Sequence, residues 1–269
     1  MEKVFRNYNA PDVKSAVREH YRKMRTNQTH DYVLRMREKY LTYDKPLALW
    51  DAMEQLNILV DVSDPDLDLP NVQHLIQSAE AIRADNRPDW MQLVGLIHDL
   101  GKAMFLWGCD EDGTSQAEQW GMVGDVFVVG CALPETCVYP EFNALNPDMQ
   151  DPRYNTANGI YKEHCGLDNL LLAWGHDEYL FQVLSHHKGN TLPEAGMAMI
   201  RYHSFYPWHT GGSYNELLNE KDRQYLEWVR DFNKYDLYTK SSKTYDLQEI
   251  KDYYQPIAKK YLGEGPLLW

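Results

Sequence analysis

The chain has 269 residues, with 27 Lys or Arg against 40 Asp or Glu, and therefore a formal net charge of −13 at pH 7. This acidic surplus disfavours nucleic acids and anionic membranes as partners, because both are polyanions that an acidic surface repels. Hydrophobic residues make up 43% and charged residues 25%, which is typical of a globular protein and excludes a largely disordered one. A chain of this length can bury one core, so we expect a single compact domain over 1–269.

The sequence has no signature of a membrane protein or of a disulfide-rich secreted protein. Its longest apolar run, near 126–133, is interrupted by Gly130 and is shorter than the ~18 residues of a membrane-spanning helix. Residues 1–6 lack the apolar core of a signal peptide. The cysteines form no CxxC pair, so we expect reduced thiols, no membrane partner and a cytoplasmic location.

The first forty residues combine many charges with apolar and aromatic residues at helical spacing. Two such series are Tyr21, Met24, Gln28 and Val33, Met36, Tyr40. We expect residues 1–45 to form an amphipathic N-terminal arm that packs on the domain as a lid. Its charged residues are expected to form a solvated face.

A second helix is predicted over 47–60, where an apolar stripe recurs at helical spacing. Residues 61–70 then hold two prolines and four aspartates, a composition that predicts a loop. The next helix is expected over 72–83, with Asn71 as its N-terminal cap.

Asp89 is expected to cap a further helix over 90–100, which Gly101 closes. A polar, acidic loop follows at 108–121, and the sequence indicates no function for it. Beyond this loop, β-branched residues bounded by glycines predict a short strand over 123–129.

The stretch 134–159 is expected to be irregular, because four prolines interrupt it. Helical spacing returns in the C-terminal half, where a turn is also expected at 206–212. The helices predicted there cover 167–174, 178–186, 193–203, 219–238 and 247–262. With so few strands, we expect a mainly α fold.

The strongest local signal for chemistry is His98 followed by Asp99 at the end of an apolar helix. Adjacent helical residues point about 100° apart, so the pair could reach two metals, or one metal with a bridging carboxylate. An isolated His-Asp pair is more often a helix-terminal histidine beside a carboxylate that accepts backbone hydrogen bonds. The pair therefore indicates a metal site only if other candidate ligands accompany it in the sequence.

Four more polar residues occupy largely apolar helical settings, in which an unpartnered imidazole or carboxylate is costly. They are His74, His176, His203 and Asp236. Each alone is more often a hydrogen-bonded core residue than a ligand. Together with His98 and Asp99 they supply four imidazoles and two carboxylates, which suit mid-series transition metals better than Ca²⁺ or Mg²⁺.

The order of these residues resembles the HD-domain superfamily, and longer blocks resemble the myo-inositol oxygenase family. The blocks span nearly the whole chain and cover 5–8, 59–61, 63–66, 94–102, 123–125, 150–154, 174–179, 203–212 and 232–240. The resemblance implies an HD-domain-like helical bundle with a few short strands. It also implies a mixed-valent Fe(II)/Fe(III) enzyme that uses O₂ to open the myo-inositol ring to D-glucuronate, a four-electron oxidation and the first step of inositol catabolism.

The resemblance further implies how two iron ions would be held. The first iron would be bound by His74, His98, Asp99 and Asp236. The second would be bound by Asp99, as the bridging carboxylate, with His176 and His203. This second iron would keep open positions for substrate or O₂. His209, six residues after His203, is expected to support that ligand from behind.

A second set of residues is implied to bind the substrate hydroxyls. It comprises Arg6, Asp61, Val62, Ser63, Lys102, Gly124, Asp125, His203, Ser204 and Lys240. Leaving a buried hydroxyl unpaired costs about 1–3 kcal/mol, so a six-hydroxyl ring requires many polar partners. Lys102, beside Asp99, is assigned with it to catalysis. Without the resemblance, Lys102 could equally interact with a helix C-terminus, and Asp61 and Lys240 could be solvated.

Two other functions stay open. An HD-type, metal-dependent phosphohydrolase would use the same histidines and aspartates to activate water, although few Lys or Arg residues lie near them to hold phosphate. A non-catalytic helical module with a structural metal is the third possibility, but it gives no purpose to Asp61, Ser63, Lys102 and Ser204. We expect myo-inositol and O₂ as partners, no nucleic acid, and a monomer.

Overall fold

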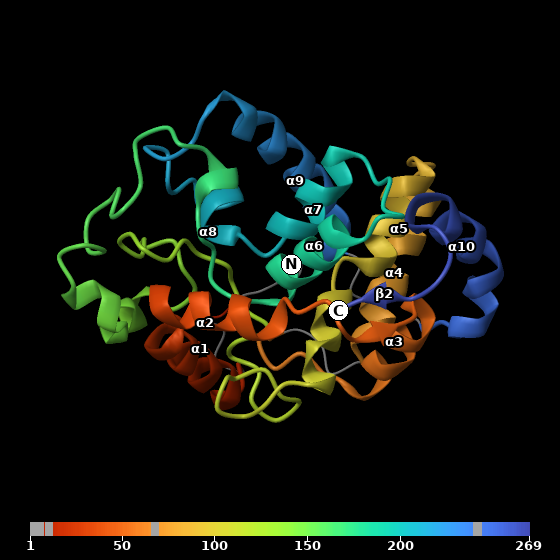
Figure 1. Ribbon diagram of the computed structural model, residues 1–269, viewed down its shortest axis with the longest axis horizontal. Coiled ribbons are helices and arrows are strands. Elements are labelled where there is room, and N and C mark those ends of the chain that lie inside the picture. Colours follow the sequence, from red (N-terminus) through yellow and green to blue (C-terminus); the bar gives the residue numbers. More distant parts are fainter. Residues whose placement is uncertain (1–7, 9–12, 66–69, 239–243) are drawn as a thin grey trace.

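The computed structural model describes residues 8, 13–65, 70–238 and 244–269, and Figure 1 shows that helices dominate this part of the chain. Helices account for 54% of the residues and strands for 2%, so the mainly α class is confirmed. The helices form one compact domain with one large hydrophobic cluster and a smaller second one.

The N-terminal segment forms α1 (Ser15–Asn27) and α2 (His30–Tyr40), drawn in red and orange in Figure 1. Thr29 caps α2, because its side-chain oxygen accepts a hydrogen bond from the backbone N of Tyr32. The apolar members of the predicted series are buried on both helices and join the large cluster, with Tyr21 fully buried, whereas Gln28 is a buried polar residue just after α1. Burial of these stripes explains why two short, highly charged segments hold helical structure.

Five helical elements follow in the first half of the chain. They are α3 (Leu49–Gln55), η1 (Leu56–Ile58), α4 (Asn71–Ala84), α5 (Asp89–Ile97) and η2 (Leu100–Leu106). Helix α4 packs on α5 at Gly95, where a Cβ atom would lie 2.7 Å from Ile82 Cδ1 and 3.0 Å from Ala79 Cα. Glycine therefore permits the close approach that brings the end of α5 beside α4.

The second half supplies the remaining helices. They are η3 (Pro140–Leu145), η4 (Pro147–Gln150), η5 (Leu167–Asn169), α6 (His176–His186), α7 (Glu194–Tyr202), α8 (Tyr206–His209), α9 (Glu220–Tyr238) and α10 (Leu247–Leu262). Helix α7 packs against α5, α6 and α9, and α4 also contacts α9. This bundle brings residues from distant parts of the sequence to one centre.

The strand content differs from the sequence-based expectation. Two strands, β1 (Pro46–Leu47) and β2 (Leu267–Leu268), form an antiparallel pair that no sequence pattern indicated. The strand predicted over 123–129 is wrong, because this segment makes only an isolated bridge, from Val128 to Leu172. Its side chains alternate between the two hydrophobic clusters, so burial on both sides explains its β-branched composition.

Three local helix predictions are also wrong. Only Leu167–Asn169 of the helix predicted over 167–174 is helical, and the extended remainder donates a hydrogen bond from Ala173 N to Phe127 O at 2.7 Å. Asp89 makes no capping bond and instead accepts hydrogen bonds from Lys260 and Tyr261. Asn71 is the first residue of α4 rather than its cap. In each case a tertiary contact outweighs the local preference.

One charged residue of the N-terminal arm is buried rather than solvated. Arg25 is 0% exposed, and its Nη2 donates to both carboxylate oxygens of Asp125, at 2.6 and 2.7 Å. The same nitrogen donates to Val138 O at 3.1 Å, and the guanidinium lies over the ring of Phe127. This pair attaches α1 to the segment that follows Gly124.

Replacing Arg25 with Met is expected to lower the free energy of unfolding by about 3–5 kcal/mol, because it leaves Asp125 as an unpaired buried charge. Chemical denaturation measures the change. The double variant Arg25→Met/Asp125→Leu should recover much of the loss, since it removes both charges. A single variant as stable as the wild type would show that the buried pair does not hold α1.

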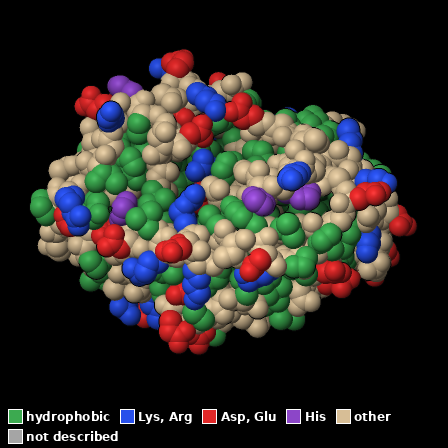
Figure 2. All heavy atoms as spheres, in the orientation of Figure 1, with side chains coloured by type: hydrophobic (Ala, Val, Ile, Leu, Met, Phe, Trp, Pro, Cys, Tyr) green, Lys and Arg blue, Asp and Glu red, His purple; other side chains and the backbone are tan. Residues whose placement is uncertain are grey.

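The molecular surface mixes charges of both signs. On the face drawn in Figure 2, Lys and Arg side chains are interspersed with Asp and Glu and gather into no extended basic patch. Among the described residues, no helix combines the length and the apolar character that crossing a membrane would require.

Candidate functional site

The bundle brings together the histidines and aspartates singled out in the sequence. His74 lies on α4 and Asp236 on α9, each within its helix, whereas the other four residues lie where helices begin or end. These are His98 and Asp99 after α5, His176 at the start of α6, and His203 after α7. All are buried except His74, whose side chain is 15% exposed.

Backbone carbonyls fix the orientation of three of the imidazoles. His98 Nδ1 donates to Gly95 O at 2.9 Å, His176 Nδ1 to Met122 O at 2.8 Å, and His203 Nδ1 to Ile200 O at 2.9 Å. A neutral imidazole that donates through Nδ1 presents an unprotonated Nε2. In its neutral form, each of these three rings directs an Nε2 lone pair toward the centre of the bundle.

The Nε2 atoms meet in two pairs. His74 Nε2 lies 3.3 Å from His98 Nε2, and His176 Nε2 lies 3.2 Å from His203 Nε2. Two unprotonated Nε2 atoms at this separation would repel one another, so each pair requires a proton or a metal ion between or beside its rings. The donor geometry therefore fits a metal ion at each pair.

Asp99 lies between the two histidine pairs. Its Oδ1 is 2.9 Å from His176 Nε2 and 3.4 Å from His203 Nε2. Its Oδ2 is 3.8 Å from His98 Nε2 and 4.0 Å from His74 Nε2. One oxygen thus faces each pair, which is the arrangement of a carboxylate that bridges two metals.

Asp236 completes the first pair. Its Oδ1 lies 2.9 Å from His74 Nε2 and 3.5 Å from His98 Nε2. Its Oδ2 is buried and has no hydrogen-bond partner among the described residues. An unpartnered buried carboxylate oxygen beside two imidazoles is a further sign that the site is built for a cation.

The electrostatics of the centre also favour positive charge. Although burial alone raises the pKa of Asp99, Lys102 and the adjacent histidines hold that pKa well below its ordinary value. Burial also raises the pKa of Asp236, but His74 and His98 outweigh it and hold that pKa well below its ordinary value. Burial lowers the pKa of His203, but Asp177, Asp99 and Asp236 outweigh it and raise that pKa to about 9. The ionised carboxylates would stabilise metal ions in the same space.

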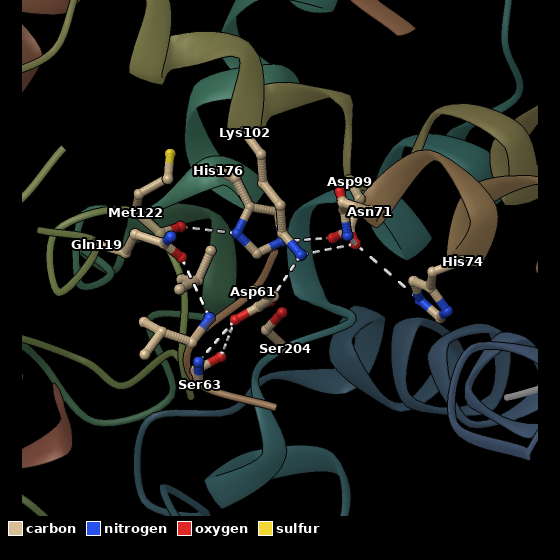
Figure 3. A network of polar contacts seen from close by, with 12 residues as sticks. Asp61, Ser63, Asn71, His74, Asp99, Lys102, Gln119, Met122, His176 and Ser204 are labelled. Atoms are coloured by element: carbon tan, nitrogen blue, oxygen red, sulfur yellow. Dashed lines mark hydrogen bonds and ion pairs between the residues drawn. The ribbon is translucent and has the colours of Figure 1, made fainter. Parts of the chain in front are cut away.

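A pocket opens beside this centre. Five of these six histidines and aspartates, all but His98, line it. The other lining residues are Asp61, Ser63, Asp64, Asn71, Gln77, Lys102, Gly124 and Ser204. Figure 3 shows the amino group of Lys102 between Asp61 and Asp99. Lys102 Nζ donates to Asp61 Oδ2 at 2.7 Å and to Asp99 Oδ2 at 2.8 Å.

The Asp61–Lys102 pair is charged throughout the physiological pH range. Burial disfavours the charged form of both groups, but the opposite charge and the hydrogen bond of the partner outweigh it. The pKa of Asp61 is therefore lowered and that of Lys102 is raised. Ser63 adds two hydrogen bonds to Asp61 Oδ1, from its backbone N at 2.8 Å and its hydroxyl at 2.6 Å. The pocket therefore offers a neutral polyol both strong acceptors and a strong donor.

Four residues implied to bind substrate are not brought into this pocket by the described structure. Arg6 and Lys240 lie outside the described residues. Val62 does not line the pocket, and the carboxylate of Asp125 is bound to Arg25.

Two residues of the site were missed as site residues in the sequence. Asn71, interpreted there as a helix cap, donates from Nδ2 to Asp99 Oδ2 at 3.0 Å. Asp177 Oδ1 lies 3.1 Å from His203 Nδ1 and accepts from Ser204 N at 3.2 Å. Asp177 follows His176 directly, and this second His-Asp pair was the signal that could have identified it.

His209 contacts the main chain of His203, in agreement with the supporting role that its spacing predicted. Its Nε2 donates to the backbone carbonyl of His203 at 2.9 Å, and it is fully buried. Burial lowers the pKa of His209 to about 4, so the ring stays neutral in the folded protein.

The buried His209 is expected to make the metal-free protein less stable in acid. Between pH 6.5 and about 4 the unfolded chain protonates this ring and the folded chain does not, so stability falls as the pH falls. The loss for this single group is about 3 kcal/mol. Urea denaturation of the metal-free wild type and of His209→Gln at pH 7 and pH 4 measures it. Equal pH dependence in the two proteins would contradict the assignment.

Comparisons with known proteins agree with this geometry. A family model described as myo-inositol oxygenase matches residues 14–269. The chain is 48% identical to a probable inositol oxygenase of Oryza sativa subsp. japonica over 96% of its length and 82% of that protein. It is 46% identical to the inositol oxygenase of Mus musculus, over 98% of the chain and 90% of the relative. It is 45% identical to the inositol oxygenase of Danio rerio, over 98% of the chain and 93% of the relative. The chain therefore belongs to the myo-inositol oxygenase family.

Proposed function

We propose that this protein is an inositol oxygenase, an oxidoreductase that converts myo-inositol and O₂ to D-glucuronate and water. Family membership over nearly the whole chain supports the reaction class. The observation that carries the proposal is the position of Asp99, which faces two histidine pairs and borders a pocket of hydroxyl-binding groups. A ring-cleaving four-electron oxidation needs both a redox centre and a polyol site, and the buried His/Asp clusters that border the pocket support the proposal.

The proposed cofactor is a pair of iron ions in the Fe(II)/Fe(III) state. One iron would be held by His74, His98, Asp99 and Asp236, and the other by Asp99, His176 and His203. When bound, the irons supply the redox chemistry and the Lewis acidity that O₂ activation requires. Nitrogen and carboxylate donors without cysteine suit iron better than they suit structural zinc.

The protein side chains would bind and orient the substrate. Asp61 would accept hydrogen bonds from substrate hydroxyls, and the protonated Lys102 would donate a hydrogen bond to a substrate oxygen near Asp99. Ser63, Gly124 and Ser204 line the same pocket and would add polar contacts. We also propose a contact from His203, and contacts from Arg6, Val62, Asp125 and Lys240 as the family resemblance implies, with residues 1–45 covering the site. The carboxylate of Asp125 is bound to Arg25, so its contact would come from its main chain.

A phosphohydrolase function is not favoured. Lys102 is the one Lys or Arg among the described residues lining the pocket, which also includes Asp61, Asp64, Asp99 and Asp236. Of the side chains described there, Lys102 would thus be the only lysine or arginine available to hold a phosphate group, whereas a neutral polyol needs no such cations. Release of phosphate from nucleotides without any turnover of myo-inositol would reverse this assignment.

Metal analysis tests the proposed centre. We expect about two iron ions per chain after loading with Fe(II), one for each histidine pair. The measurement is iron and zinc content by elemental analysis of the purified protein. A protein that retains a single zinc, or no metal, would contradict the two-iron centre.

The remaining assignments concern the whole molecule. We propose a monomer consisting of one domain over 1–269, located in the cytoplasm. All four cysteines are free thiols, which supports a reducing compartment.

A further inference from the structure

In the acidic loop 108–121, the buried side-chain amide of Gln119 forms hydrogen bonds with both chain neighbours of the pocket residue Asp61. Gln119 is 6% exposed, and its Oε1 accepts a hydrogen bond from Val62 N at 3.2 Å. Its Nε2 donates to Val60 O at 3.1 Å and to Gln116 O at 3.0 Å. The side chain thus forms hydrogen bonds with the main chain on either side of Asp61.

The segment that receives these bonds has no regular structure of its own. Residues 59–65 form neither helix nor strand, and Val60 is 40% exposed. The position of Asp61 therefore depends on individual contacts rather than on a helix or sheet. The bonds from Gln119 restrain its main chain, while Lys102 and Ser63 restrain its carboxylate.

The main chain of Gln119 continues toward the metal centre. Its carbonyl accepts hydrogen bonds from Met122 N at 2.9 Å and Val123 N at 3.0 Å. The carbonyl of Met122 then accepts from His176 Nδ1 at 2.8 Å. Gln119 consequently connects the main chain beside Asp61 to the carbonyl that orients His176.

We propose that Gln119 is a positioning residue for substrate binding, which acts by holding Asp61 at the pocket. This assigns a role to the loop 108–121, and it rests on the proposed function. Gln119 touches neither the pocket nor the metal-binding side chains, so its loss should affect substrate affinity more than the chemical step.

The primary test is Gln119→Met, which keeps the length of the side chain and removes its hydrogen bonds. We expect KM for myo-inositol to rise about tenfold and kcat to stay within about twofold, with unchanged iron content. Gln116→Met is the matched control, since Gln116 lies in the same loop, is exposed and donates to Ile58 O. It should leave KM within about twofold of the wild-type value.

A second variant guards against misfolding of the first. Gln119→Glu keeps the acceptor for Val62 N but loses the donor to Val60 O, so its KM should lie between those of the wild type and Gln119→Met. In an Asp61→Asn background, Gln119→Met should raise KM by less than about twofold, because the two residues act through one contact chain. A purely structural role for Gln119 would give additive effects instead.

The outcomes separate this inference from the proposed function. A wild-type protein that forms no glucuronate from myo-inositol would overturn the proposed function and this inference with it. An active wild type with unchanged KM in Gln119→Met would overturn the inference alone. Equal losses of kcat, iron and thermal stability in Gln119→Met would also overturn it, because they indicate a general structural role.

Discussion

Replacement of Asp99 by alanine is expected to reduce bound iron from about two ions per chain to fewer than one, and to lower inositol-dependent turnover by at least about a thousandfold. One oxygen of Asp99 faces each histidine pair, at 2.9 Å from His176 Nε2 and 3.8 Å from His98 Nε2. Removing the carboxylate therefore takes a ligand from both positions at once. Elemental analysis and an oxygen electrode measure the two effects.

Asp222→Ala is the matched control for this experiment. Asp222 is also a buried carboxylate, but it accepts hydrogen bonds from the backbone N atoms of Leu167 and Asn219, away from the metal centre. Its replacement should lower the melting temperature and leave iron content and turnover per folded molecule near the wild-type values. Retention of both irons by Asp99→Ala would contradict the bridging role.

Replacement of Lys102 by methionine is expected to leave about two irons in place and to lower turnover by about 10²–10³-fold. The variant keeps much of the side-chain volume but removes the donor to Asp61 and Asp99. Both carboxylates would then lose their buried cationic partner, and the pocket would lose the charge that faces the substrate. Steady-state kinetics with iron-loaded protein checks the prediction.

Lys39→Met provides the control for loss of a lysine elsewhere. Lys39 is half exposed and pairs with Asp112 at the surface, so its removal should leave turnover unchanged. Loss of iron from Lys102→Met would show that the lysine organises the metal centre rather than the substrate. Unchanged turnover in Lys102→Met would contradict its catalytic assignment.

Much of the fold could be predicted because the strongest helices carry long periodic patterns. Helix α10 was predicted with its observed bounds, and α9 within one residue. The segment 123–129 was misjudged because its alternation comes from burial between two clusters, which a sequence pattern cannot distinguish from a strand. The pairing of β1 with β2 joins residues more than two hundred positions apart, and two-residue strands leave no periodic signal.

The clustered histidines and aspartates of the candidate metal site were easier to single out in the sequence than the residues that hold them. His98 and His203 stand at helix ends in apolar sequence, so their chemistry is visible locally. Asn71 bonds Asp99, 28 positions away, and Gln119 bonds Val62, 57 positions away, so neither contact is visible in the local sequence. A polar residue in a loop or at the start of a helix also has many commoner roles. Asp125, by contrast, was expected to bind substrate, but its carboxylate is bound to Arg25, a residue of α1 that lies 100 positions away in the sequence.

The most direct test of the central claim is the stoichiometry of the reaction catalysed by iron-loaded protein. The oxidation of myo-inositol by O₂ to D-glucuronate and water balances without any other oxidant, so the account predicts one O₂ consumed per glucuronate formed. An oxygen electrode and quantitative product analysis on the same sample give this ratio. No inositol-dependent O₂ uptake by a protein that carries both irons, or uptake without glucuronate, would contradict the account.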